Sequence, residues 1–197
     1  MGEIVKLLAS ILPLFLFLLL SNLPPAAFAQ EKANNWETYR GEKCDYQIGL
    51  PGEYQISEET VTAFDDETEL TQDVIDYKKI IDLENALNMN ATCRQLAEGE
   101  RDILSTDFIQ DALDAYISSN NIFVAGRKVS KDDENNQISG IIIGARGDSD
   151  DSFLTTQYWV GSNSLLIFEL ELTGSDTIEN QDVFANILSR VKLKDPS

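Results

Sequence analysis

The sequence predicts an α+β fold, an antiparallel β-sheet with helices packed on it. Two observations lead to this fold class. Several segments alternate apolar and polar residues with the period of two that strands require, and short polar turns join four of them in consecutive hairpins. Two other segments, 105–119 and 176–188, carry apolar residues at helical spacing. Helices packed across one face of a single sheet would bury both kinds of apolar surface.

The first predicted strand is CDYQIGLP, residues 44–51, in which Tyr46, Ile48 and Leu50 share one face. The turn Pro51-Gly52 ends it. Two further extended pieces, EYQIS and TVTAF, continue the sheet.

The segment 65–100 allows two interpretations. Val74, Tyr77 and Ile81 have helical spacing, although VIDYKKIID would also suit a strand. We expect a helix in this segment.

The first amphipathic helix follows Ser105, which is a suitable N-cap residue. Its apolar stripe consists of Phe108, Ile109, Ala112, Leu113, Tyr116 and Ile117.

Two hairpins and a closing helix complete the chain. NIFVAGRKVS and QISGIIIGAR flank the turn KDDENN, while SFLTTQYWV and SLLIFELELT flank GSN. In the last strand four apolar residues face one way and two glutamates the other: Leu166, Phe168, Leu170 and Leu172 against Glu169 and Glu171. The helix 176–188 carries Ile178, Val183, Phe184, Ile187 and Leu188.

The N-terminus has the pattern of a secretory signal peptide. Lys6 precedes the apolar run 11–20, and the small-x-small sequence Ala27-Phe28-Ala29 suits a signal peptidase. An uncleaved membrane anchor is the alternative, but Pro13 interrupts the apolar run. We therefore expect residues 1–29 to be removed, 30–43 to form an extended segment and 44–197 to form a single domain. The protein would reside in a periplasm or lumen, or be secreted, with no stable membrane anchor.

Charge and composition exclude several functions. The formal net charge is −19, which would repel nucleic acid and anionic lipid and would favour a basic protein partner. There is no histidine, so Ser-His-Asp triads, Cys-His pairs and ordinary catalytic zinc sites are excluded. We expect a monomer with no cofactor, no metal ion and no enzymatic activity.

Cys44 and Cys93 are the two cysteines of the chain. In an oxidising compartment such a pair is expected to form a disulfide, and the alternative is two buried free thiols. A loop of about 50 residues closed by this bond would stabilise the fold by roughly 4 kcal/mol.

The order of elements resembles the PsbP-like family of α/β/α sandwich proteins. The resemblance rests on the early strand YQIGLP, a helix in mid-chain, consecutive hairpins and the closing FANILSRVKL, and it spans residues 44–193. It implies an assembly, stabilising or accessory role. The histidine-dependent metal proposals of the photosystem members do not carry over, because the chain lacks histidine.

Two carboxylate clusters have alternative readings. Glu169 and Glu171 lie about 7 Å apart on one strand face, as in a carboxylate-based hydrolase, or they form salt bridges with Arg127 or Arg146. The loop GDSDDS, residues 147–152, is either a solvated turn or a Ca²⁺ site, although it lacks the EF-hand pattern.

The leading hypothesis is a non-enzymatic binding or accessory protein; a hydrolase and a cation- or ligand-binding envelope protein are the alternatives. The sheet face opposite the helices would bind the partner, with an aromatic ring amid charged groups. Its predicted residues are Arg127, Arg146, Gln157, Trp159, Glu169 and Glu171.

Overall fold

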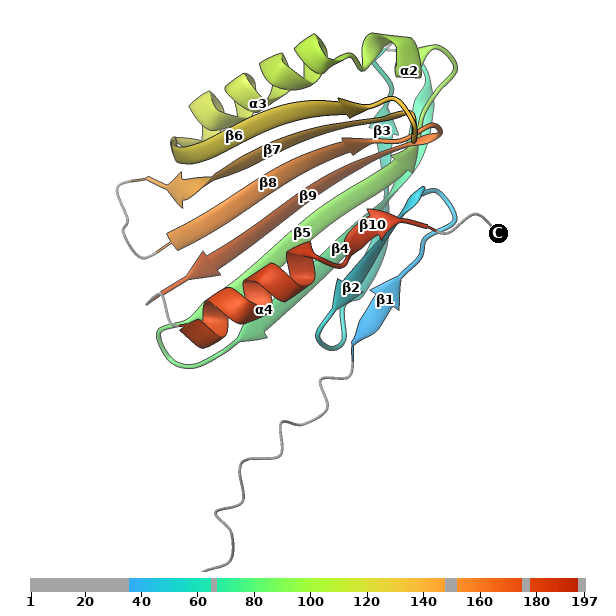
Figure 1. Ribbon diagram of the computed structural model, residues 1–197. Helices are drawn as coiled ribbons and strands as arrows, with labels where there is room; N and C mark the ends of the chain where they lie inside the picture. The colour runs from blue at the N-terminus through green and yellow to red at the C-terminus, as the bar shows by residue number, and fades with distance from the viewer. Residues whose placement is uncertain (1–35, 65–66, 148–151, 175–177, 195–197) are drawn as a thin grey trace, which may run out of the picture. The chain divides into compact units, whose positions relative to one another are not determined.

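The computed structural model describes residues 36–64, 67–147, 152–174 and 178–194, without the side chains of 178–180. These residues form two antiparallel sheets and three helices (Figure 1). The predicted signal peptide 1–29 and most of the loop 147–152 lie outside them. No helix among the described residues is long and apolar enough to cross a membrane.

The large sheet has seven strands, arranged as two meanders joined through β5 and β9. The first meander is β3 (Gln55–Thr62), β4 (Glu69–Ile80) and β5 (Ala86–Gln95). The second is β6 (Ile122–Asp132), β7 (Gln137–Arg146), β8 (Ser152–Val160) and β9 (Ser164–Thr173). The spatial order is β3-β4-β5-β9-β8-β7-β6.

The small sheet has three strands in the order β1-β2-β10, namely β1 (Glu37–Tyr39), β2 (Tyr46–Leu50) and β10 (Val191–Leu193). β1 lies within the segment 30–43 and pairs with β2, so this segment contributes to the fold from Trp36 onward. All five residues of β2 are buried.

The helices are α2 (Glu100–Ile103), α3 (Thr106–Asn120) and α4 (Ile178–Leu188). The N-cap of α3 is Ser105, whose Oγ accepts a hydrogen bond from the amide of Phe108 at 3.2 Å. α3 lies directly on β7, because a Cβ added at Gly140 would come within 2.4 Å of Ile109 Cγ2.

The two long helices pack on opposite faces of the large sheet, so the prediction of helices on one face was wrong. α3 contacts β6 and β7, and it buries Ile109 and Leu113 against a cluster that includes Ile142. α4 contacts β9 and β2 on the other face, where Phe184 joins Phe168. The reason is visible in β9: its first half is apolar on both faces, and each face requires its own cover.

The predicted helix within 65–100 was also wrong, because this segment forms β4 and β5. In β4 the side chains of Ile75 and Tyr77 are buried while those of Asp76 and Lys78 are exposed, which is the period of a strand. Pairing with β5 over the whole length from Gln72 to Ile80 overrides the local helical spacing.

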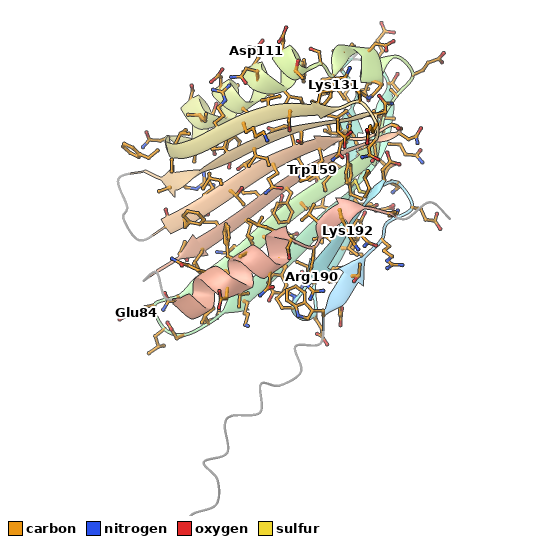
Figure 2. The ribbon with its side chains drawn as sticks, in the orientation of Figure 1. Glu84, Asp111, Lys131, Trp159, Arg190 and Lys192 are labelled. Atoms are coloured by element: carbon orange, nitrogen blue, oxygen red, sulfur yellow. A yellow bond between two sulfur atoms is a disulfide. The ribbon has the colours of Figure 1, made fainter. Side chains whose placement is uncertain are left out.

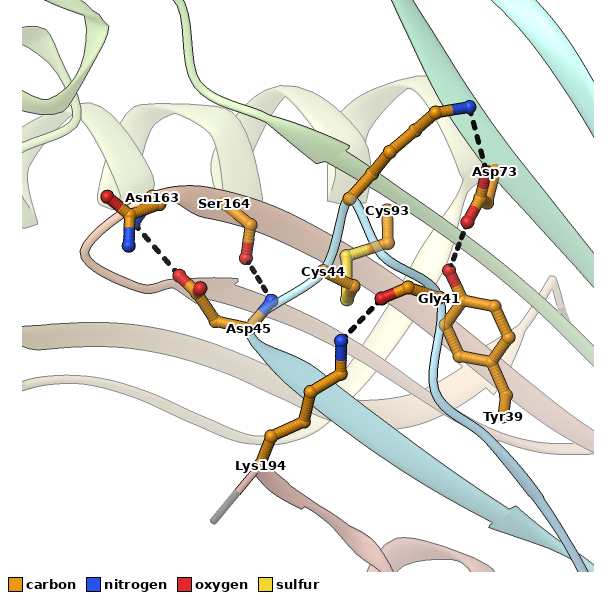
Figure 3. Close-up of a disulfide and its surroundings, with 10 residues drawn as sticks. Tyr39, Gly41, Cys44, Asp45, Asp73, Cys93, Asn163, Ser164 and Lys194 are labelled. Carbon is orange, nitrogen blue, oxygen red and sulfur yellow. Dashed lines mark hydrogen bonds and ion pairs between the residues drawn. A yellow bond between two sulfur atoms is a disulfide. The ribbon is translucent and has the colours of Figure 1, made fainter. Parts of the chain in front are cut away.

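A disulfide between Cys44 and Cys93 connects the start of β2 to β5, with the two Cα atoms 5.6 Å apart (Figure 3). Polar contacts surround this bond. The Tyr39 hydroxyl donates to Asp73 at 2.6 Å, and the Asp45 carboxylate accepts from the amide of Asn163 at 2.9 Å. The small sheet is thus held to the large one by one covalent bond and several hydrogen bonds.

A buried ion pair anchors α2. The Arg94 guanidinium binds both oxygens of Glu100, at 2.6 and 3.0 Å. Burial alone would raise the pKa of the Glu100 carboxyl, but hydrogen bonds from Arg94 and from the amides of Phe64 and Ala97 outweigh it and lower this pKa. Both side chains are fully engaged, so we assign the pair a structural role.

Reducing the disulfide should weaken the fold strongly. The two cysteines are 49 residues apart, so we expect dithiothreitol to lower the free energy of unfolding by about 4 kcal/mol in urea titrations. The Cys44→Ala/Cys93→Ala variant, which has no bond to lose, is the control and should not respond to the reductant. Two reactive thiols in the denatured, unreduced protein would contradict the assignment.

The tyrosines should ionise only as the protein unfolds. Burial is the largest cause of a raised pKa in all six, and for Tyr116 the pKa rises to about 12. The folded pKa values exceed the unfolded value of about 10, so keeping the tyrosines protonated contributes to the free energy of unfolding. This contribution is fully present below pH ~10 and is lost as the pH rises above it. Phenolate absorbance and circular dichroism should therefore change together. The same titration in urea should show half-ionisation near pH ~10. Tyrosines that ionise there in the folded protein would contradict the expectation.

Candidate functional site

The six residues predicted to form one binding face divide between the two faces of the sheet. Gln157 lies opposite Phe168, and Trp159 lies opposite Leu166. Directly opposed residues of antiparallel strands point to the same face, so Gln157 and Trp159 belong to the α4 side. The other four residues, Arg127, Arg146, Glu169 and Glu171, lie on the α3 side, which the sequence analysis expected to be free of helices.

Trp159 is partly buried and packs against the core on the α4 side, so it was wrongly placed in the partner face. Figure 2 labels Trp159 among the side chains of the sheet. Its ring lies 5.8 Å from that of Tyr46, and its indole nitrogen donates to Gln157 at 2.9 Å. Gln157 itself is buried. The error was one residue of register: β8 has apolar side chains on both faces, and Leu154 and Val160 occupy the side toward α3.

Arg127 lies on the α3 side but is occupied in holding the helix. It forms an ion pair with Asp114 and donates to the carbonyl of Gln110 at 2.8 Å, both on α3. The alternative in which Arg127 pairs with Glu169 or Glu171 is not what the structure shows.

Arg146 brings the two glutamates together. Its guanidinium lies 3.0 Å from Glu169 and 3.5 Å from Glu171, so the predicted salt bridge to Arg146 is present. The side chain reaches over β8, and it also donates to Asn120 of α3 at 3.1 Å. Glu169 is further bound by the hydroxyl of Tyr116.

Tyr116 and Asn120 are site residues that the sequence analysis missed. Tyr116 counted as a member of the apolar stripe of α3, and its ring does pack against the core. Burial, followed by the hydrogen bond to the Glu169 carboxylate, raises its pKa to about 12, so the phenol remains a proton donor at physiological pH. One feature of the sequence could have indicated this role: Tyr116 brings a hydroxyl group into the apolar stripe of α3, and a buried hydroxyl needs a hydrogen-bond partner.

Beyond this cluster, polar side chains form two rows across the strands. In register, Asp76 lies opposite Asn90, and Asn90 lies opposite Glu169. The neighbouring row has Lys78, Asn88 and Glu171. α3 lies over β6 and β7, so it leaves this part of the face, on β4, β5 and β9, open.

The rows border a cavity of about 480 Å³. Four carboxylates and one lysine line it, together with amides and the ring of Tyr54. Its charged residues are Glu53, Asp76, Lys78, Glu169 and Glu171. A cavity of this size and composition suits a polar or cationic group such as the basic side chain of a partner.

The described residues offer no metal site, since no group of three or more acidic or cysteine side chains in them is arranged to hold an ion. In the hairpin turn KDDENN the carboxylate of Asp132 forms its hydrogen bonds within the turn. It accepts from the side chain of Asn135 at 2.7 Å and from the amide of Glu134 at 3.1 Å. Asp148, Asp150 and Asp151 of GDSDDS fall outside the described residues.

Comparisons with known proteins identify the fold. The chain resembles the solution structure of cyanobacterial PsbP (CyanoP) from Synechocystis sp. PCC 6803, with a TM-score of 0.51 and 13% identity over 87% of this chain and 99% of that one. It has a PsbP-like fold. No family model and no curated protein matches the sequence itself. The PsbP-like arrangement here is dominated by its antiparallel sheet, with one long helix on each face.

The Tyr116 hydroxyl should contribute to stability through Glu169. We expect Tyr116→Phe to lower the free energy of unfolding by about 1 kcal/mol, measured in urea, because it removes a hydrogen bond to a charged acceptor. Tyr54→Phe is the matched control, since its hydroxyl has no hydrogen-bond partner among the described residues. Equal stability of the two variants would show that the bond to Glu169 contributes nothing.

Proposed function

We propose that the protein is an extracytoplasmic, non-enzymatic accessory protein that binds a basic protein partner through the open polar face. This face consists of the rows on β4, β5 and β9 together with their cavity. The leader pattern and the disulfide support export. An accessory role is what the resemblance to PsbP-like proteins implies.

The open polar cavity carries the proposal. Its carboxylates outnumber its lysine by four to one, and Arg146 offsets only part of that charge. The amides of Asn88 and Asn90 add hydrogen-bonding groups at the centre of the face. A basic side chain entering the cavity would gain both charge complementarity and oriented hydrogen bonds.

The geometry disfavours the alternative of a carboxylate-based hydrolase. Such an enzyme needs one carboxyl group as proton donor and a second one facing the substrate. Here Arg146 contacts both Glu169 and Glu171, and Tyr116 binds Glu169 as well. Neither carboxylate is free for this chemistry. Glycoside turnover abolished by Glu169→Gln would nevertheless overturn the non-enzymatic proposal.

The test is co-purification with a variant that fills the cavity. Asn88→Arg places a long cation beside Glu171, its neighbour in register, so the fold should tolerate it. We expect the tagged wild-type protein to retain a basic partner from the native envelope, and the variant to lose it. Asn186→Arg adds the same charge at an exposed position of α4 and should behave like the wild type.

Melting temperatures of both variants must match the wild type for the comparison to hold. If Asn88→Arg retains the partner as well as Asn186→Arg does, the polar face is not the binding site.

A further inference from the structure

A second, apolar surface lies on the other face of the sheet. Four large apolar side chains gather where β6, β7 and β8 meet: Phe123 is 57% exposed, Val124 43%, Ile143 36% and Phe153 41%. Phe123 is opposite Ala145 of β7, and the ring of Phe153 contacts that of Phe184 on α4 at a centroid distance of 5.0 Å. Most of this surface therefore lies on the α4 side.

Two adjoining cavities of about 300 Å³ each form this surface. One lies between the sheet and α4, where Ile143, Leu172, Ala185 and Leu188 line it. The other is bounded by Phe123 and Ala145 near the free edge of the sheet. Both include Phe153, so two apolar sockets flank one ring. We call them together the apolar groove.

The apolar groove is open because α4 covers only part of this face. α4 contacts β9 and β2 and reaches β8 where Phe184 meets Phe153. Thr155 and Gln157 of β8 are buried. None of the described helices covers β6 and β7 from this side. At the end of the sheet that carries Phe123, Ile143 and Phe153, all three of which are exposed, the three adjacent strands span about 10 Å, which is also the diameter of one helix. The uncovered width is thus that of one helix lying beside α4.

Strand addition at the edge of β6 is disfavoured. The register shifts between Val124 and Gly126, and such a bulge interrupts the edge that an added strand would need. Lys128 and Lys131 are exposed on the same strand and protect it further. An occupant would therefore lie on the face.

The negative charge of the chain indicates which kind of molecule could bind in the apolar groove. With a formal net charge of −19, a second copy and an anionic membrane are both repelled, whereas a cationic partner is attracted. We propose that the apolar groove binds an amphipathic, positively charged helix of a partner protein. Two apolar side chains one turn apart would enter the two sockets, and the basic face would remain toward solvent.

The experiment uses two model peptides of about 18 residues, long enough to form a helix. Both contain leucine and lysine in equal numbers. In the first the leucines follow the helical period, and in the second they alternate with lysine. Fluorescence anisotropy should show tighter binding of the first, and Ile143→Ser and Phe123→Ser should each weaken it roughly tenfold. The second peptide has the same charge and composition but no apolar helical face, so it reports all attraction that does not depend on a helix.

Leu83→Ser is the matched control, because Leu83 is an exposed apolar residue outside the apolar groove and its loss should change nothing. Asn88→Arg should weaken both lysine-rich peptides alike, because the polar face also attracts cations, but it should leave the preference for the first peptide over the second unchanged, which separates this proposal from the one for the polar face. Equal binding of the two peptides, or wild-type binding by Ile143→Ser, would overturn the proposal.

Two further measurements identify a different occupant. A dimer in sedimentation experiments that Ile143→Ser dissociates would assign the apolar groove to a second copy of this chain. Binding to phosphatidylcholine vesicles that Ile143→Ser abolishes would assign it to lipid. Either result would overturn the proposal of a cationic helix.

Discussion

The fold depends on the pairing of β5 with β9. These strands are far apart in the sequence, yet they align over their full length, from Ala86 opposite Thr173 to Gln95 opposite Ser164. This pairing joins two meanders that otherwise share no strand contact in the large sheet. Cys93 lies within this pairing, opposite Leu166, so the disulfide attaches the segment before β2 to a central strand of the large sheet. Without the pairing, the core beneath α4 would lose one of its two central strands.

The two long helices cover the sheet diagonally, and this explains both open surfaces. α3 covers the half formed by β6 and β7 on one face, and α4 covers the half near β9 on the other. The uncovered half on the α3 side carries Asn88, Asn90 and Glu171. The uncovered half on the α4 side carries Phe123, Ile143 and Phe153. One fold therefore presents a polar surface and an apolar surface at opposite corners of the large sheet.

Ionisable groups inside the protein serve mainly to hold elements together. Arg94 and Glu100 fix α2, Arg127 holds α3 on β6, and Tyr39 donates to Asp73 beside the disulfide. The Arg146 cluster is partly exposed, as the pair of Arg127 with Asp114 is, but its glutamates also border the open polar face. Screening by water makes such exposed pairs weak contributors to stability. In the proposed complex Arg146 would orient the two glutamates toward the partner.

The sequence by itself determined the antiparallel sheet with helices packed on it, the two hairpins and the N-cap at Ser105. It also named Arg146 as one of two candidate partners of the glutamates. These features depend on local periods, turn residues and neighbouring strands. Tertiary structure decided the rest. Alternation shows which residues of a strand share a face but not how that strand is paired with the next, so Trp159 was placed on the face of Glu169 although it lies opposite Leu166 and packs on Tyr46. The helical spacing of Val74 and Tyr77 yielded to strand pairing with β5. The opposite placement of α3 and α4 follows from burial on both faces of β9, which becomes evident only when β5 and β8 flank that strand.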